Sequence, residues 1–111
     1  MENYYLYKSD KPKKKYVLVI SDKKIYFGAT GYRDYTLMHK KSSKFYEPSK
    51  EERDKVKERY LKRHEKEPKE EKSPSLLSDM ILWNKPTIRE SVKDYEKKFN
   101  VNIIIKNKKL K

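Results

Sequence analysis

Short runs of β-branched and aromatic residues occur at both ends of the chain. Residues 4–8, 15–21 and 24–28 predict three strands, with a hairpin turn at Asp22–Lys23 between the second and the third. Residues 101–106 form an isoleucine-rich fourth run that we expect to join the same sheet. The pattern therefore predicts a small antiparallel sheet, built from an N-terminal hairpin and a C-terminal strand.

Helix signals lie between these strands, at about 49–67, 74–83 and 87–100. The first and third segments each begin with a capping box, a Ser or Thr followed three residues later by Glu. The second begins at a proline, which suits the first turn of a helix. Residues 68–74 are interpreted as a polar linker, and residues 28–48 as an irregular, aromatic-rich segment.

The third helical segment carries one apolar stripe, at Ile88, Val92, Tyr95 and Phe99. Such spacing places the four side chains on one face of a helix, which predicts that this face packs on the sheet. The apolar run that ends at Trp83 is likewise interpreted as core. Together these patterns predict a single α+β domain over residues 1–111, with two to three helices packed on the sheet.

Composition narrows the class of protein. The chain has 111 residues, of which 42% are charged and 34% hydrophobic, and no cysteine. Ten tyrosines make it too aromatic for a disordered chain. No apolar run approaches the roughly 18 residues of a membrane span, and the N-terminus lacks a signal-peptide pattern, so we expect a protein that is not secreted. The lack of cysteine excludes disulfide scaffolds and thiolate zinc sites.

The net charge of +13 is unevenly distributed. Unbalanced basic clusters occupy residues 8–15 and 106–111, whereas the middle of the chain is nearly balanced. Of the 30 cationic residues all but five are lysines, which suit phosphates rather than bidentate base contacts. This balance favours sequence-tolerant binding to DNA or RNA; the alternative is a lysine-rich codon usage that keeps a small protein in solution.

The segment after the third predicted strand holds both glycines, Gly28 and Gly31, and interleaves rings with cations. A strand exit that needs positive φ explains the glycines better than a phosphate cradle does. The neighbouring rings could stack on bases or form the edge of a core. The candidate nucleic-acid contacts are Lys11, Lys13, Lys14, Lys15, Tyr32, Arg33, Tyr35, Arg59, Arg63, Lys106, Lys108, Lys109 and Lys111.

The sequence supplies little for catalysis or metal binding. His39 and His64 are the only histidines, and without cysteine a metal site would need other ligands at suitable spacing. A histidine paired with Asp34 could act as a base only if the fold brought the two together. We therefore expect no enzyme, no cofactor, no metal site and no catalytic residue.

Four sequence blocks carry a resemblance. They are residues 27–36 (FGATGYRDYT), 59–64 (RYLKRH), 82–87 (LWNKPT) and 91–94 (SVKD). The pattern resembles a family of small uncharacterised proteins of large nucleocytoplasmic DNA viruses, from which the chain departs between His64 and Leu82. The resemblance implies a viral source, with the protein in the virion or inside the infected cell, in its cytoplasm or nucleus. It implies no activity.

These observations predict a non-enzymatic basic viral protein that binds nucleic acid through phosphate contacts. The alternative is a structural or interaction protein of the virion, such as a minor capsid or internal-layer component. In that case the basic ends would contact viral capsid or core proteins.

Overall fold

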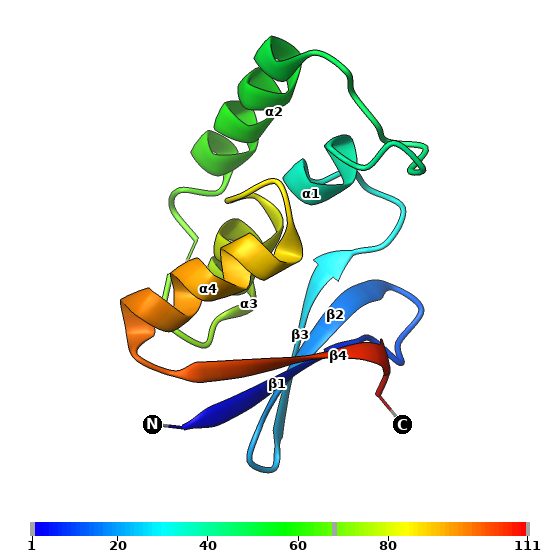
Figure 1. Ribbon diagram of the computed structural model, residues 1–111. Coiled ribbons are helices and arrows are strands. Elements are labelled where there is room, and N and C mark those ends of the chain that lie inside the picture. The colour runs from blue at the N-terminus through cyan, green and yellow to red at the C-terminus, as the bar shows by residue number, and fades with distance from the viewer. Residues whose placement is uncertain (1, 68, 111) are drawn as a thin grey trace.

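A computed structural model describes residues 2–67 and 69–110, and it confirms the predicted α+β class. The four strands form one sheet, in the order β3-β2-β1-β4 (Figure 1). The strands are β1 Asn3–Lys8, β2 Lys14–Ile20, β3 Lys23–Ala29 and β4 Asn102–Lys109.

The sheet is mixed, which corrects the expected antiparallel arrangement. β2 runs antiparallel to both β1 and β3, but β4 pairs in parallel with β1, from Asn3 opposite Asn102 onwards. The reason is the long helical connection. Its last helix returns the chain to the end of the sheet where β1 begins, and there Asn102 N–H donates to the Glu2 carbonyl. A strand that starts beside the start of β1 must run in the same direction.

The loop of the hairpin between β2 and β3 lies one residue earlier in the sequence than expected. Ile20 pairs with Lys23, so the loop is Ser21–Asp22 rather than Asp22–Lys23. Ser21 takes a φ of 55°, a left-handed conformation that two-residue hairpin loops require at their first position.

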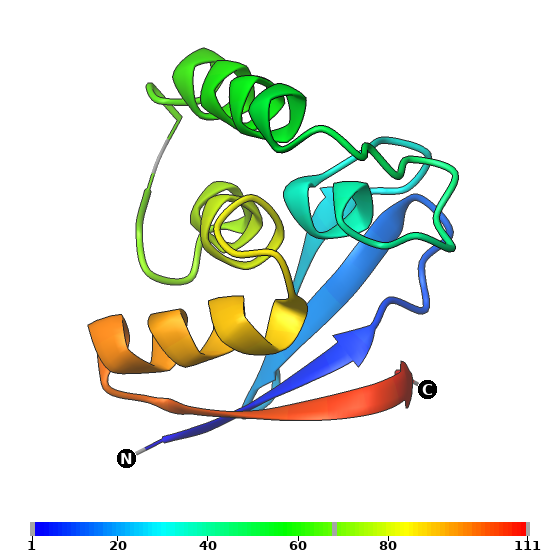
Figure 2. The same ribbon diagram turned by 45° about the horizontal axis from the view of Figure 1, so that its top comes forward.

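The helices lie on one face of the sheet (Figure 2). Ser49 and Thr87 cap the two long helices, and each side chain accepts the backbone N–H of the glutamate three residues on, as predicted. The helical elements are α1 Tyr35–Met38, α2 Lys50–Arg63, α3 Pro74–Leu77, the π-helix η1 Ser78–Leu82 and α4 Ile88–Phe99.

Three helical features differ from expectation. The segment interpreted as irregular contains a short helix, α1. Asp34 caps this helix by accepting Leu37 N–H. α2 ends at Arg63 with His64 as its cap, earlier than the predicted Glu67. The segment at 74–83 is not one α-helix, since Trp83 N–H bonds to the Ser78 carbonyl five residues back.

The core lies between the helices and the sheet, where the α4 stripe packs as predicted. Val92 and Tyr95 are buried, and Ile88 and Phe99 pack against the core edge. Trp83, 5% exposed, is also core. Within the described residues, no helix is long and apolar enough to cross a membrane.

Candidate functional site

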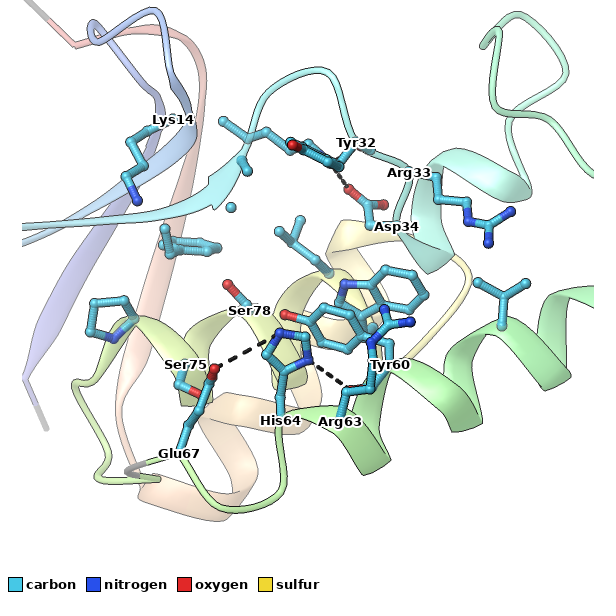
Figure 3. A pocket seen from close by; sticks show the side chains of 18 of the residues that line it. Lys14, Tyr32, Arg33, Asp34, Tyr60, Arg63, His64, Glu67, Ser75 and Ser78 are labelled. Atoms are coloured by element: carbon cyan, nitrogen blue, oxygen red, sulfur yellow. Dashed lines mark hydrogen bonds and ion pairs between the residues drawn. The ribbon is translucent and has the colours of Figure 1, made fainter.

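A cleft of about 930 Å³ lies where α2 faces the end of β3. Figure 3 shows Tyr32 and Asp34 on one side of it, from the loop after β3, and Arg63 and His64 on the other, from the end of α2. Leu82 and Trp83 of the η1 region also line it. A cavity of this size falls within the range of small-molecule pockets, about 300–1,000 Å³.

Gly28 permits the close approach of η1 to β3 that closes the bottom of this cleft. Its φ is +79°, and a Cβ at this position would lie 2.7 Å from Leu82 Cδ1. The φ of Gly31 is +84°, yet a Cβ there would meet nothing within 4 Å. Both glycines thus have the positive φ expected of a strand exit, but only Gly28 is also needed for packing.

Four exposed cations around the cleft are not committed to other contacts. Lys14 comes from β2, Arg33 from the loop after β3, and Arg59 and Arg63 from α2, one turn apart. None of the four side chains has a hydrogen bond or an ion pair with another residue that the structure describes. They are therefore available to an anion from outside.

Lys15 also lines the cleft, but its charge is used within the fold. Its Nζ lies 2.6 Å from Asp34 Oδ2 and donates to the Tyr32 carbonyl. Asp34 is 1% exposed and also accepts Thr36 Oγ1–H and Leu37 N–H. This buried carboxylate is a structural anchor for α1 and for the loop that carries Tyr32, and its lone pairs are already occupied.

Three aromatic side chains that line the cleft form a stack. Tyr60 packs face to face on Trp83, with ring centroids 4.2 Å apart and planes at 9°, and His64 stacks on Tyr60 at 4.2 Å. Burial, with Asp79 and Glu67 nearby, raises the pKa of Tyr60 to about 12, so its hydroxyl is neutral at physiological pH. The stack fixes the end of α2, from which Arg63 projects.

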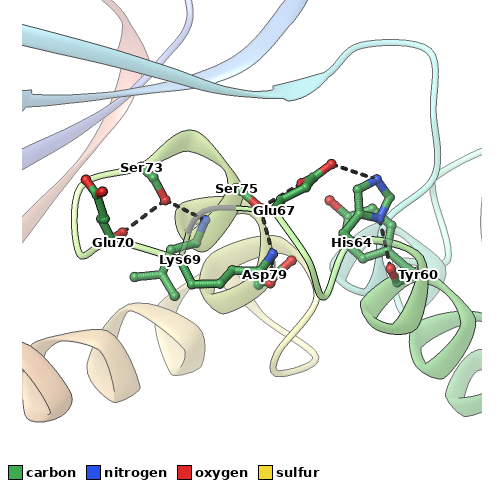
Figure 4. Close-up of polar contacts among 9 residues, drawn as sticks. Tyr60, His64, Glu67, Lys69, Glu70, Ser73, Ser75 and Asp79 are labelled. Atoms are coloured by element: carbon green, nitrogen blue, oxygen red, sulfur yellow. Dashed lines mark hydrogen bonds and ion pairs between the residues drawn. The ribbon is translucent and has the colours of Figure 1, made fainter.

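A chain of polar contacts occupies the two carboxylates nearest this stack (Figure 4). Ser75 Oγ donates to Glu67 Oε1 and accepts from Lys69 Nζ, which also pairs with Asp79 at 2.6 Å. His64 Nε2 lies 3.8 Å from Glu67. The contacts tie the residues after α2 to α3 and η1, and Lys69 offsets the negative charge of Asp79.

A second cleft, of about 560 Å³, adjoins the first. It lies where the two basic ends meet, since Lys8 pairs with Lys109 in the sheet and Leu110 N–H donates to the Lys8 carbonyl. Lys11 also lines it. Lysines that are separated by most of the sequence therefore lie together.

Comparison with known proteins assigns no activity. The chain is similar to a family of unknown function (DUF5754) over residues 4–44, which is less than half of its length. The matched region spans β1 to β3, α1 and the loop with Tyr32 and Arg33. No curated protein and no solved structure matches the chain.

The structure gathers eight of the thirteen predicted contact residues around the two clefts. Tyr32, Lys14 and Lys15 line both of them. The first cleft adds three arginines and the second adds two lysines: Arg33, Arg59, Arg63, Lys11 and Lys109.

The other five predicted residues are not part of these clefts. Tyr35 is 8% exposed and donates to Asp54, so it belongs to the core and cannot stack on a base. Lys106 lies near the ring of Tyr5, 6.0 Å from its centroid. Lys13 and Lys108 are exposed outside both clefts, and Lys111 lies outside the described residues.

Two other cations of α2 are used within the fold. Arg53 donates to the Glu47 carbonyl and Lys57 to the Asn84 carbonyl. Lys57 also lies 4.7 Å from the Tyr35 ring centroid. These two cations hold α2 against the rest of the fold, and the neighbouring side with Arg59 and Arg63 faces the cleft.

Neither histidine bonds to Asp34. His64 lines the first cleft together with Asp34 but bonds to the Tyr60 carbonyl, whereas His39 bonds to the Tyr35 carbonyl and lines neither cleft. No group of three or more His, Asp or Glu side chains within residues 2–67 and 69–110 is placed to hold a metal ion.

Proposed function

We propose that this protein binds nucleic acid through its phosphates, without strong sequence preference. The observation that carries the proposal is the set of four uncommitted cations around the first cleft, Lys14, Arg33, Arg59 and Arg63. They come from three different parts of the fold, so their meeting at one site is a product of the tertiary structure.

The electrostatics of the cleft favour an anion with several charges. Five cationic side chains line it against two carboxylates, and those carboxylates already have partners in Lys15 and Ser75. Water screens the mutual repulsion of exposed cations, so the free protein tolerates the arrangement. The phosphates of one nucleic-acid chain can be attracted to all the cations at once, and the chain releases its counterions on binding.

The test is a salt titration of binding to a labelled, mixed-sequence oligonucleotide, followed by fluorescence anisotropy. Four phosphate contacts on a single strand predict a log–log slope of about −3, which corresponds to about 50-fold weaker binding between roughly 50 and 200 mM salt. Undetectable binding at the lower salt concentration would contradict the proposal.

Matched arginine variants locate the interface. Arg59→Gln and Arg63→Gln should each reduce the magnitude of the salt slope by about 0.7, because each removes one phosphate contact. Arg89→Gln is the control, since Arg89 is exposed on α4 and lines neither cleft. Equal effects of all three variants would indicate a general charge effect rather than this site.

A competition experiment distinguishes nucleic acid from an acidic protein surface, which is the other partner that the basic ends could bind. Poly-glutamate offers negative charge without phosphates or bases. We expect it to displace the oligonucleotide only at much higher charge concentration. Equal displacement would contradict nucleic-acid binding and favour the interaction-protein alternative.

A further inference from the structure

We infer that the two clefts form one continuous track for a single nucleic-acid strand, with Tyr32 as the stacking residue where they meet. This inference rests on the proposed function and adds the strand type, the path and the residue that contacts the bases. The first observation is that the clefts share a wall. Lys14, Lys15, Tyr32 and Asp34 line both of them.

The charge along the combined track is strongly positive. Its acids are Asp10, Asp34 and Glu67, each of which has a partner within the fold: Tyr26, Lys15 and Ser75 respectively. The cations are Lys8, Lys11, Lys14, Lys15, Arg33, Arg59, Arg63 and Lys109.

Tyr32 has the geometry of a stacking platform. Its side chain is 70% exposed, the most exposed of the large hydrophobic residues described. The backbone beneath it is fixed, because the Tyr32 carbonyl accepts Lys15 Nζ at 2.7 Å. Thr30 anchors the preceding residues by donating its N–H to the Lys13 carbonyl and its hydroxyl to the Pro12 carbonyl. A ring held on a rigid loop between two cationic clefts loses little entropy when a base stacks on it.

The stacking geometry selects a single strand. In a duplex the bases are paired and stacked on one another, so their faces cannot reach a ring at the protein surface. In a single strand the bases can turn out and stack on aromatic side chains. Each cleft has a volume large enough for a nucleotide.

The experiment measures anisotropy with a single-stranded oligonucleotide and with the duplex of the same sequence. We expect tighter binding of the single strand. Tyr32→Ala should weaken that binding about 5- to 100-fold, and Tyr32→Phe should restore most of it. Tyr46→Ala is the control, since Tyr46 is exposed yet lines neither cleft. Circular dichroism and urea unfolding establish that each variant is folded.

A second pair of variants tests the continuity of the track. With long oligonucleotides, which can reach both clefts, Lys109→Gln in the second cleft should lower the magnitude of the salt slope as much as Arg59→Gln does in the first. With short oligonucleotides Lys109→Gln should have no such effect. If the arginine variants weaken binding but Tyr32→Ala and Lys109→Gln do not, the track is refuted and the proposed function stands. Tighter binding of the duplex also refutes the track, and no binding of either nucleic acid refutes both proposals.

Discussion

At the residue scale, one glycine determines how closely two elements approach. Gly28 lies between Lys15 of β2 and Leu82 of η1, and it has a positive φ within β3, one residue before the strand ends. Only glycine adopts this φ without strain, and only a missing Cβ leaves space for Leu82. The residue therefore sets how closely η1 packs on β3 beneath the cleft.

Gly28→Ala should lower the free energy of unfolding by about 2–4 kcal/mol, because it adds a close contact to an unfavourable φ. Gly31→Ala is the matched control, since it has a similar φ but open space around the new Cβ. It should cost only about 1–2 kcal/mol. Urea unfolding of the two variants measures the difference, and equal losses would show that packing against Leu82 contributes nothing.

At the element scale, the joint between α4 and β4 also depends on one backbone conformation. Asn100 ends α4 with a φ of 55° and a ψ of 50°, and its N–H donates to the Glu96 carbonyl. Glu96 then reaches over the joint, where its carboxylate accepts Ile103 N–H at 2.7 Å. The left-handed residue directs the chain from the helix straight into the edge strand.

Asn100→Gly should leave the stability unchanged or raise it by a few tenths of a kcal/mol, because glycine accepts the left-handed conformation freely. Asn100→Ala should cost about 1 kcal/mol. Asn107→Ala on β4, where φ is negative, is the control and should have little effect. Thermal unfolding ranks the three variants, and a loss in Asn100→Gly as large as in Asn100→Ala would contradict the role of the left-handed cap.

The sequence predicted the elements whose signals are local, and it failed where a distant contact decides. The caps at Ser49 and Thr87 and the stripe on α4 are such local signals, and the structure confirms them. The π-helix η1 has no local signal. The parallel direction of β4 likewise depends on where α4 delivers the chain. In the candidate site, the exposed cations could be identified from residue type and spacing. The Tyr60–Trp83 stack could not, because it joins α2 to the end of η1 and forms only in the folded protein.

At the scale of the whole molecule, buried tyrosine hydroxyls connect distant parts of the chain. Tyr4 of β1 donates to the Glu71 carboxylate, and Tyr95 of α4 donates to the Glu71 carbonyl. Burial and the Glu71 contact raise the pKa of Tyr4 to about 12, and burial also raises the pKa of Tyr95. These two tyrosines hold the segment after α2, interpreted from sequence as a linker, against both layers of the fold.

The tyrosines predict a loss of stability in alkali. A folded-state pKa above the unfolded value of about 10 means that the folded protein keeps its phenolic protons more tightly. The stabilisation is therefore complete below about pH 10 and is lost as the pH rises toward 12. Urea unfolding over this range should show a falling free energy of unfolding. Tyr60→Phe should make the fall shallower than in the unaltered protein.

Tyr32→Phe is the control for this series, because it alters an exposed ring that takes no part in the core. It should leave the pH profile of the unaltered protein unchanged. A profile that stays flat above about pH 10 in the unaltered protein would contradict a stabilising role for the neutral tyrosines.

The pairing of the first strand with the last has a consequence for synthesis of the protein. β1 lies inside the sheet, yet β4 supplies one of its two neighbours from the far end of the chain, as in the contact between Asn3 and Asn102. While a ribosome makes the chain, β1, β2 and β3 emerge first, and the hydrogen-bonding edge of β1 stays open. An open edge can pair with strands of other chains. Lys109 also joins the other lysines of the second cleft only when β4 docks, so the same late step closes the edge and completes the proposed binding track.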